Sequence, residues 1–103
     1  LILPYQSENA YSALHLYPIQ LDPEKTDRTR ASVFDKLRQA GIGVNVHYIP
    51  VHTQPYYARL GFKRGDFPVA EAYYANALSL PMYATLTPED QQHVIRTITE
   101  VLG

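Results

Sequence analysis

The sequence predicts a small α+β domain, a split βαβ sandwich in which helices pack on a three-stranded sheet. Three observations lead to this fold class. An extended segment, an amphipathic segment of helical period and a second extended segment follow one another early in the chain, which is the order of a βαβ unit. A short apolar run comes later and can pair antiparallel between or beside the first two strands. The 103 residues are enough for one domain with a modest core.

The first strand is predicted over residues 12–21, where alternate residues share one face of an extended chain. Pro18 has no N–H to donate to a neighbouring strand, so this strand should lie at an edge of the sheet or carry a bulge. A helix is predicted over residues 28–40, because apolar side chains recur there at helical spacing. Gly41 supplies its C-terminal stop.

The second strand is predicted over residues 42–49, which show the clearest alternation of apolar and polar residues in the chain. The face that carries Val44 and Val46 should point to the core. Tyr48 shares that face, so its ring should be mostly buried with its hydroxyl near the surface. His47 points the other way and should lie at a surface cleft.

The rest of the chain predicts three helices and one strand. A short helix should cover residues 54–60, and a second helix should begin at Pro68, a residue suited to the first helical position. The later apolar run, residues 78–81, is predicted to be a short buried strand. The last helix should follow Thr87, which can cap it together with Asp90 three residues on.

Composition excludes several classes of function. A net charge of -1, with nine basic and ten acidic residues, argues against nucleic acid as a partner. The absence of cysteine excludes disulfides and thiolate metal sites and is compatible with a cytoplasmic protein. The apolar runs are too short for a membrane span. Residues 1–11 are predicted to be a connector and residues 12–103 the domain, and the start at Leu1 indicates a piece of a longer chain.

The segment VHYIPVHTQPYY, residues 46–57, concentrates polar aromatic side chains and is the candidate functional region. His47 and His52 are five residues apart, but no cysteine or close carboxylate completes a metal site, and His15 could join only through a tertiary contact. No serine lies in a G-x-S-x-G elbow and no glycine-rich phosphate loop is present. Periodicity alone is also consistent with His47 being a solvated side chain on an exposed strand face, and with tyrosines that pack in a core or an interface.

Four segments together resemble the C-terminal domain of the DegT/DnrJ/EryC1/StrS sugar aminotransferases. They carry the patterns H-Y-x-P-x-H, P-x-A-E and S-L-P-x-Y, and the resemblance runs from residue 10 to the end. Within that family, the sequence is most similar to the enzymes that aminate a UDP-linked 4-keto-6-deoxy-N-acetylhexosamine on the way to pseudaminic acid. The segments are HLYPIQL (15–21), GIGVNVHYIPVHTQPYY (41–57), FPVAEAYYANALSLPMY (67–83) and LTPEDQQHVI (86–95).

This resemblance implies a fold type I enzyme that uses pyridoxal phosphate. In that family a large domain, absent from these residues, holds the cofactor on a lysine, and the small C-terminal domain closes over it. Lys25 in a turn, Lys36 on a polar helix face and Lys63 in a loop are poor candidates for a desolvated Schiff-base lysine. The 103 residues alone are therefore expected to bind no cofactor and to catalyse nothing. The full-length protein is expected to be a homodimer that moves an amino group, from L-glutamate, to C4 of the sugar.

The resemblance also implies roles for four side chains. His47, Tyr48 and His52 match H-Y-x-P-x-H, and Asn45 lies on the same strand face as His47, so these residues are expected to line the nucleotide-sugar side of the cleft. Their task would be hydrogen bonding and orientation of the substrate. The alternative from another class is a free-standing α+β module that binds a small ligand or regulates, without catalysis.

Overall fold

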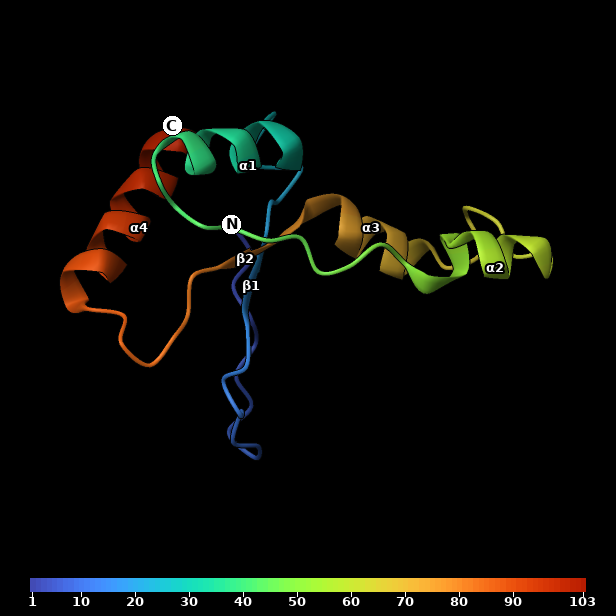
Figure 1. Ribbon diagram of the computed structural model, residues 1–103, viewed down its shortest axis with the longest axis horizontal. Coiled ribbons are helices and arrows are strands. Elements are labelled where there is room, and N and C mark those ends of the chain that lie inside the picture. The colour runs from blue at the N-terminus through green and yellow to red at the C-terminus, as the bar shows by residue number, and fades with distance from the viewer.

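The computed structural model describes residues 1–103 as four α-helices, one 3₁₀ helix and a two-stranded antiparallel sheet. The α+β class is confirmed, whereas the predicted three-stranded sheet is wrong. Helices α1 and α4 pack together on one side of the strands, and α2 and α3 extend away from them on the other (Figure 1). The elements are β1 (Tyr17–Gln20), α1 (Arg30–Gln39), η1 (Val51–Thr53), α2 (Pro55–Arg59), α3 (Pro68–Asn76), β2 (Ala77–Leu80) and α4 (Pro88–Leu102).

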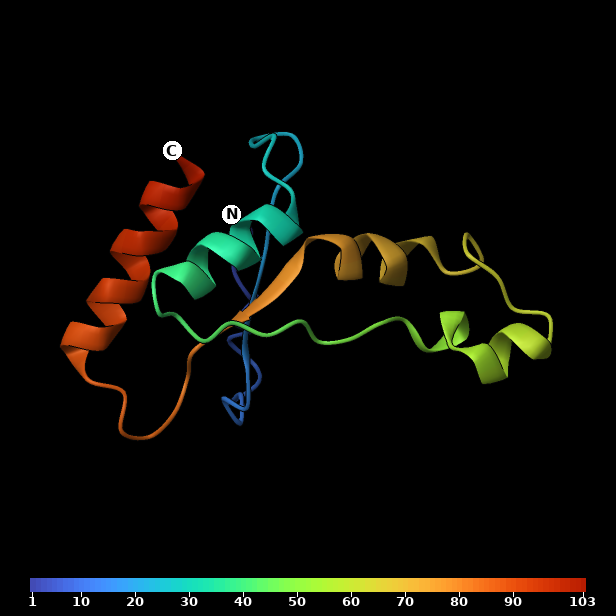
Figure 2. The same cartoon turned by 45° about the horizontal axis from the view of Figure 1, so that its top comes forward.

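Strand β2 lies between β1 and the extended segment that follows α1. On one edge, Ile19 of β1 pairs with Leu78. On the other edge, the Ser79 N–H donates to the Asn45 carbonyl at 2.8 Å, and the Asn45 N–H donates back at 3.2 Å. This isolated bridge is all that forms of the strand predicted over residues 42–49, because the chain then leaves β2 and runs toward η1 (Figure 2).

Strand β1 is shorter than the predicted span of residues 12–21. Residues 12–16 are exposed and lie outside it, and Leu14, at φ +50°, has left the extended region that a strand requires. On its outer edge, Gln20 exchanges backbone hydrogen bonds of 2.8 and 2.9 Å with Ile2. Continuing that antiparallel pairing would set Pro4 opposite Pro18, and neither has an N–H to donate. The edge position predicted for Pro18 is therefore confirmed.

The core lies where β1, β2, α1, α4 and the segment after α1 meet. Val33 and Leu37 of α1 are fully buried, as the helical spacing predicts, and Ile42 and Val44 are buried as the alternation predicts. The cluster consists of Ile19, Leu21, Val33, Leu37, Ile42, Val44, Leu78 and Ile98.

The helix ends follow the expected local chemistry. The Thr29 hydroxyl accepts from the Ser32 N–H and caps α1. The helix therefore begins at Arg30, two residues after the predicted start at residue 28. Gly41, at φ +80°, follows its end, and Pro68 occupies the first position of α3. At α4, Thr87 and Asp90 form a reciprocal capping box.

Residues 50–76, which contain η1, α2 and α3, form a projection that we call the arm. Helices α2 and α3 contain no buried residue, and His52 in η1 is the only buried residue of the arm. Arg30 at the start of α1 donates a hydrogen bond to the Tyr74 carbonyl, and its guanidinium lies 4.3 Å from the centre of the Tyr74 ring. This contact ties the base of the arm to the core.

Leu37→Ala should lower the free energy of unfolding by about 2–5 kcal/mol, because it leaves a cavity against the buried faces of the sheet. Leu60→Ala in the arm is the matched control. Its side chain is 62% exposed, so its effect should stay within roughly 0.5 kcal/mol. Urea unfolding measures both, and equal losses would place the core elsewhere.

Candidate functional site

A cleft of about 410 Å³ lies between the segment after α1, the end of β2 and the first turns of α4. Polar side chains from three separate parts of the chain line it: Asn45, His47, Ser79, Tyr83, Asp90 and His93. Two of the four predicted site residues, Asn45 and His47, thus lie in one cleft. The backbone hydrogen bonds to Ser79 hold Asn45 at the edge of β2. They thereby position the wall of the cleft that carries Asn45 and His47.

His47 lies at a surface cleft, as its position in the alternation predicts. Its ring is partly buried, and Nδ1 is 2.8 Å from the Ser79 hydroxyl oxygen. The hydroxyl can donate to an unprotonated Nδ1 or accept from a protonated one. The contact fixes the orientation of the imidazole in either case.

Tyr48 is 73% exposed, so the predicted burial of its ring is wrong. Alternation determines which face is buried only while the segment stays paired with the sheet, and pairing with β2 ends at Asn45. The Tyr48 ring instead lies edge-on to the His47 ring, with centroids 4.6 Å apart. It is a neighbour of the cleft but does not line it.

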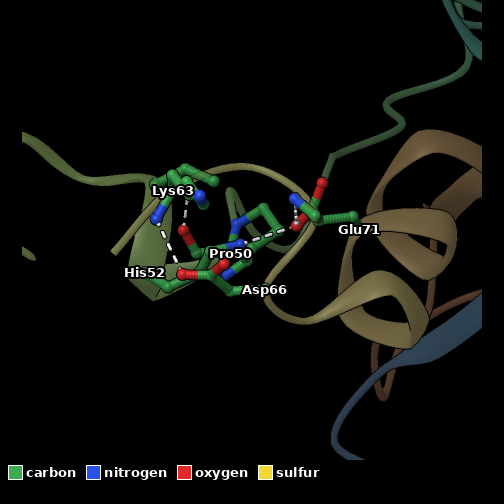
Figure 3. A network of polar contacts seen from close by, with 7 residues as sticks. Pro50, His52, Lys63, Asp66 and Glu71 are labelled. Carbon is green, nitrogen blue, oxygen red and sulfur yellow. Dashed lines mark hydrogen bonds and ion pairs between the residues drawn. The ribbon is translucent and has the colours of Figure 1, made fainter. Parts of the chain in front are cut away.

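His52 lies in the arm and not in the cleft. Its side chain is only 7% exposed, and Nε2 is 2.8 Å from Glu71 Oε1, a contact that Figure 3 shows from close by. The same oxygen accepts the Gly65 N–H at 2.7 Å. The Phe67 ring covers the imidazole at 4.8 Å between centroids. The structure therefore divides the predicted residues between the cleft and the interior of the arm.

The cleft contains four polar residues to which the sequence assigned no site role, namely Ser79, Tyr83, Asp90 and His93. Ser79 and Tyr83 belong to the S-L-P-x-Y pattern, and a serine among apolar strand residues is a signal of a polar partner. Asp90 was read as a helix cap, and its Oδ2 does bond to Thr87. His93 is three residues further along α4 and so lies on the same helix face as Asp90; the i, i+3 spacing could have paired them.

The cleft suits recognition by hydrogen bonds. An amide, two imidazoles, a serine hydroxyl, a phenol and the Asp90 carboxylate offer donors and acceptors. No carboxylate hydrogen-bonds to His47, so the His47–Ser79 pair lacks the third group that orients a base in a catalytic triad. No group of three or more metal-ligating side chains occurs, and none of the helices combines the length and apolar character needed to span a bilayer.

The three lysines do not fit a cofactor that must be held as a Schiff base. Lys25 is 76% exposed and lies 3.6 Å from Asp22. Lys36 and Lys63 are also exposed, and neither a lysine nor an arginine lines the cleft. Pyridoxal phosphate needs a desolvated lysine and a site for its phosphate, and these residues supply neither.

Comparison with known proteins gives one consistent result. Residues 1–99 match the DegT/DnrJ/EryC1/StrS aminotransferase family. The chain is 38% identical over 104 residues to the spore coat polysaccharide biosynthesis protein SpsC of Bacillus subtilis, covering 99% of this chain and 27% of that protein. The chain thus spans about a quarter of the length of such a relative.

Solved structures agree with this match. A DegT DnrJ EryC1 StrS aminotransferase from Brucella abortus superposes with a TM-score of 0.82 at 28% identity, covering 99% of this chain and 26% of that one. PseC of Helicobacter pylori, described as an aminotransferase involved in the biosynthesis of pseudoaminic acid, gives a TM-score of 0.75 at 28% identity, covering 85% and 23%.

The pKa of the Glu71 carboxyl lies below its ordinary value of 4.5, first because the Gly65 N–H donates to it and second because His52 does. A depressed pKa in the folded protein adds stability above pH 4.5 that is lost as the pH falls through the folded pKa. In a carbon-13 NMR titration, His52→Leu should raise the pKa of Glu71 but leave it below 4.5, since the Gly65 bond remains. An unshifted pKa in the wild-type protein would contradict the contact.

Proposed function

Because the chain belongs to the DegT/DnrJ/EryC1/StrS aminotransferase family, we propose that it is the C-terminal part of a pyridoxal-phosphate-dependent sugar aminotransferase. The protein that carries it would transfer an amino group, from L-glutamate, to C4 of a UDP-4-keto-6-deoxy-N-acetylhexosamine. The product would enter the synthesis of a surface polysaccharide or of a glycan on flagellin.

The choice of substrate rests on two kinds of support. The motifs H-Y-x-P-x-H, P-x-A-E and S-L-P-x-Y resemble those of enzymes on the way to pseudaminic acid. PseC carries that pathway in its description, and the spore coat protein SpsC carries polysaccharide biosynthesis in its name. Both point to a sugar as the molecule that is aminated.

The observation that carries the proposal is the cleft where Asn45 and His47 meet Ser79. A nucleotide sugar presents hydroxyl groups, amide groups and phosphate oxygens, which amide and imidazole side chains can bind. The Ser79 contact at 2.8 Å orients the His47 ring in advance of binding, so less freedom is lost when a substrate arrives. These side chains would bind and orient the sugar, and Tyr48 would supply an exposed phenol beside them.

Pyridoxal phosphate would supply the carrier for the amino group, and we place its lysine in the part of the protein that corresponds to the remaining length of the relatives. That part would be the large cofactor-binding domain, and it would be the main partner of the cleft. We also propose that the protein works as a homodimer in the cytoplasm. Because none of the three lysines fits the cofactor, no step of the reaction is assigned to this chain beyond substrate binding.

His47→Ala in the protein that carries this chain should raise the KM for the nucleotide sugar by about tenfold, the effect of losing one well-placed hydrogen bond. The visible absorbance of the bound cofactor should not change. His15→Ala is the matched control, because His15 is an exposed histidine outside the cleft. Loss of the cofactor absorbance would show that His47 has a different role from substrate binding. An unchanged KM would show that His47 does not contact the substrate.

The 103-residue chain by itself should form no stoichiometric adduct with pyridoxal phosphate, since exposed lysines react weakly and without preference. Borohydride reduction followed by mass spectrometry tests this. A single adduct at Lys25, Lys36 or Lys63, accompanied by transamination, would contradict the proposal that the cofactor is held elsewhere.

A further inference from the structure

The span from Val46 to Ile49 carries the proposed sugar-facing residues but has no backbone hydrogen bond of its own. Its last backbone anchor is Asn45, which pairs with Ser79, and the next backbone bond after it joins the Thr53 N–H to the Pro50 carbonyl. Val46 packs against the core, but Tyr48 and Ile49 are 73% and 51% exposed, so burial does not hold the second half of the span. The position of Tyr48 and Ile49 must come from contacts on either side of them.

The contact at the first end is the one between His47 and Ser79. At the second end, His52 is buried against Phe67 and bonds to Glu71. Glu71 Oε1 accepts from both His52 and the Gly65 N–H. One carboxylate oxygen therefore joins η1, the loop before α3, and α3 itself (Figure 3).

This contact also unites two of the sequence patterns. His52 is the last residue of H-Y-x-P-x-H, and Glu71 is the last residue of P-x-A-E, 19 positions later. The two patterns are separate in the chain but meet at one hydrogen bond of 2.8 Å. A pairing of this kind explains why a histidine and a glutamate are useful at these two places without either one touching a ligand.

We propose that His52 is a positioning residue that, through Glu71, fixes the span from Val46 to Ile49 beside the cleft, a proposal that rests on the proposed function for its effect on substrate. In this arrangement Glu71 is the anchor and Gly65 holds its carboxylate in place. His52 does not contact the sugar. Its Nε2 is already bonded, and its side chain is 7% exposed, so a ligand could reach it only after the pair with Glu71 had broken.

Limited digestion with chymotrypsin tests the positioning directly. The protease needs a mobile stretch of chain around the bond it cuts, so cleavage after Tyr48 reports local opening of the span even though the ring is exposed. Glu71→Ala should speed this cleavage by about tenfold, since a change of that size follows from losing a hydrogen bond to a charged group. His52→Gln, with Glu71 in place, should keep most of the wild-type protection, because its amide can still donate to Glu71.

Glu100→Ala is the matched control, because this glutamate is exposed on α4, a helix that lies on the other side of the strands from α2 and α3 (Figure 1). It should leave the cleavage rate unchanged. If Glu71→Ala does not fold, Glu71→Gln decides, because it keeps an acceptor oxygen and loses only the charge; cleavage after Tyr48 should then rise by about threefold. Faster cleavage after Tyr56 or Tyr57 with no change after Tyr48 would overturn the proposal, because Glu71 would then hold only the arm.

Enzyme kinetics on the same variants separates this proposal from the proposed function. Glu71→Ala should raise the KM for the nucleotide sugar while kcat and the half-reaction with the amino donor stay unchanged. An unchanged KM, in a variant whose span has opened, would overturn the link between the span and the substrate. A wild-type protein that aminates no nucleotide sugar would instead overturn the proposed function, and the digestion pattern would still decide the role of His52.

Discussion

The backbone contact between Asn45 and Ser79 is the constraint on which the rest of the structure depends. Its two hydrogen bonds, of 2.8 and 3.2 Å, attach the segment after α1 to the free edge of β2. That attachment buries Ile42 and Val44 in the core and sets His47 against the Ser79 hydroxyl. One residue of β2 therefore joins the hydrophobic core to the polar cleft. Because β2 is paired on both edges, neither wall can shift without breaking backbone hydrogen bonds.

The arm is held together in a different way from the core. Its α-helices, α2 and α3, bury no side chain, and its aromatic residues lie largely at the surface. It is held by polar contacts, namely Arg30 with Tyr74 at the base and His52 with Glu71 inside. Contacts between aromatic rings, such as Phe67 on His52 and on Phe62, add to these. Segments with little buried apolar surface open at lower free energy than a core does. We therefore expect the arm to open at lower free energy than α1, α4 and the sheet.

The four residues implied by the family resemblance do not act as one group in space. Asn45 and His47 line the cleft, Tyr48 is exposed beside it, and His52 is buried in the arm. They are neighbours in sequence, but the chain leaves β2 between Asn45 and η1. A short motif can therefore combine residues that face a ligand with a residue that fixes the course of the chain between two elements.

The sequence by itself determined the elements whose causes are local. Thr87 with Asp90 and the prolines at positions 68 and 88 start their helices through contacts within one turn, and the spacing of Val33 and Leu37 selects the buried face of α1. Alternation likewise predicted the burial of Val44 and the surface position of His47. Only the tertiary structure decided where alternation ceases to predict burial. Tyr48 is exposed because pairing with β2 ends at Asn45. The tertiary structure also decided the pairing of His52 with Glu71, since a hydrogen bond between residues 19 positions apart follows from how η1 and α3 pack and not from either local pattern.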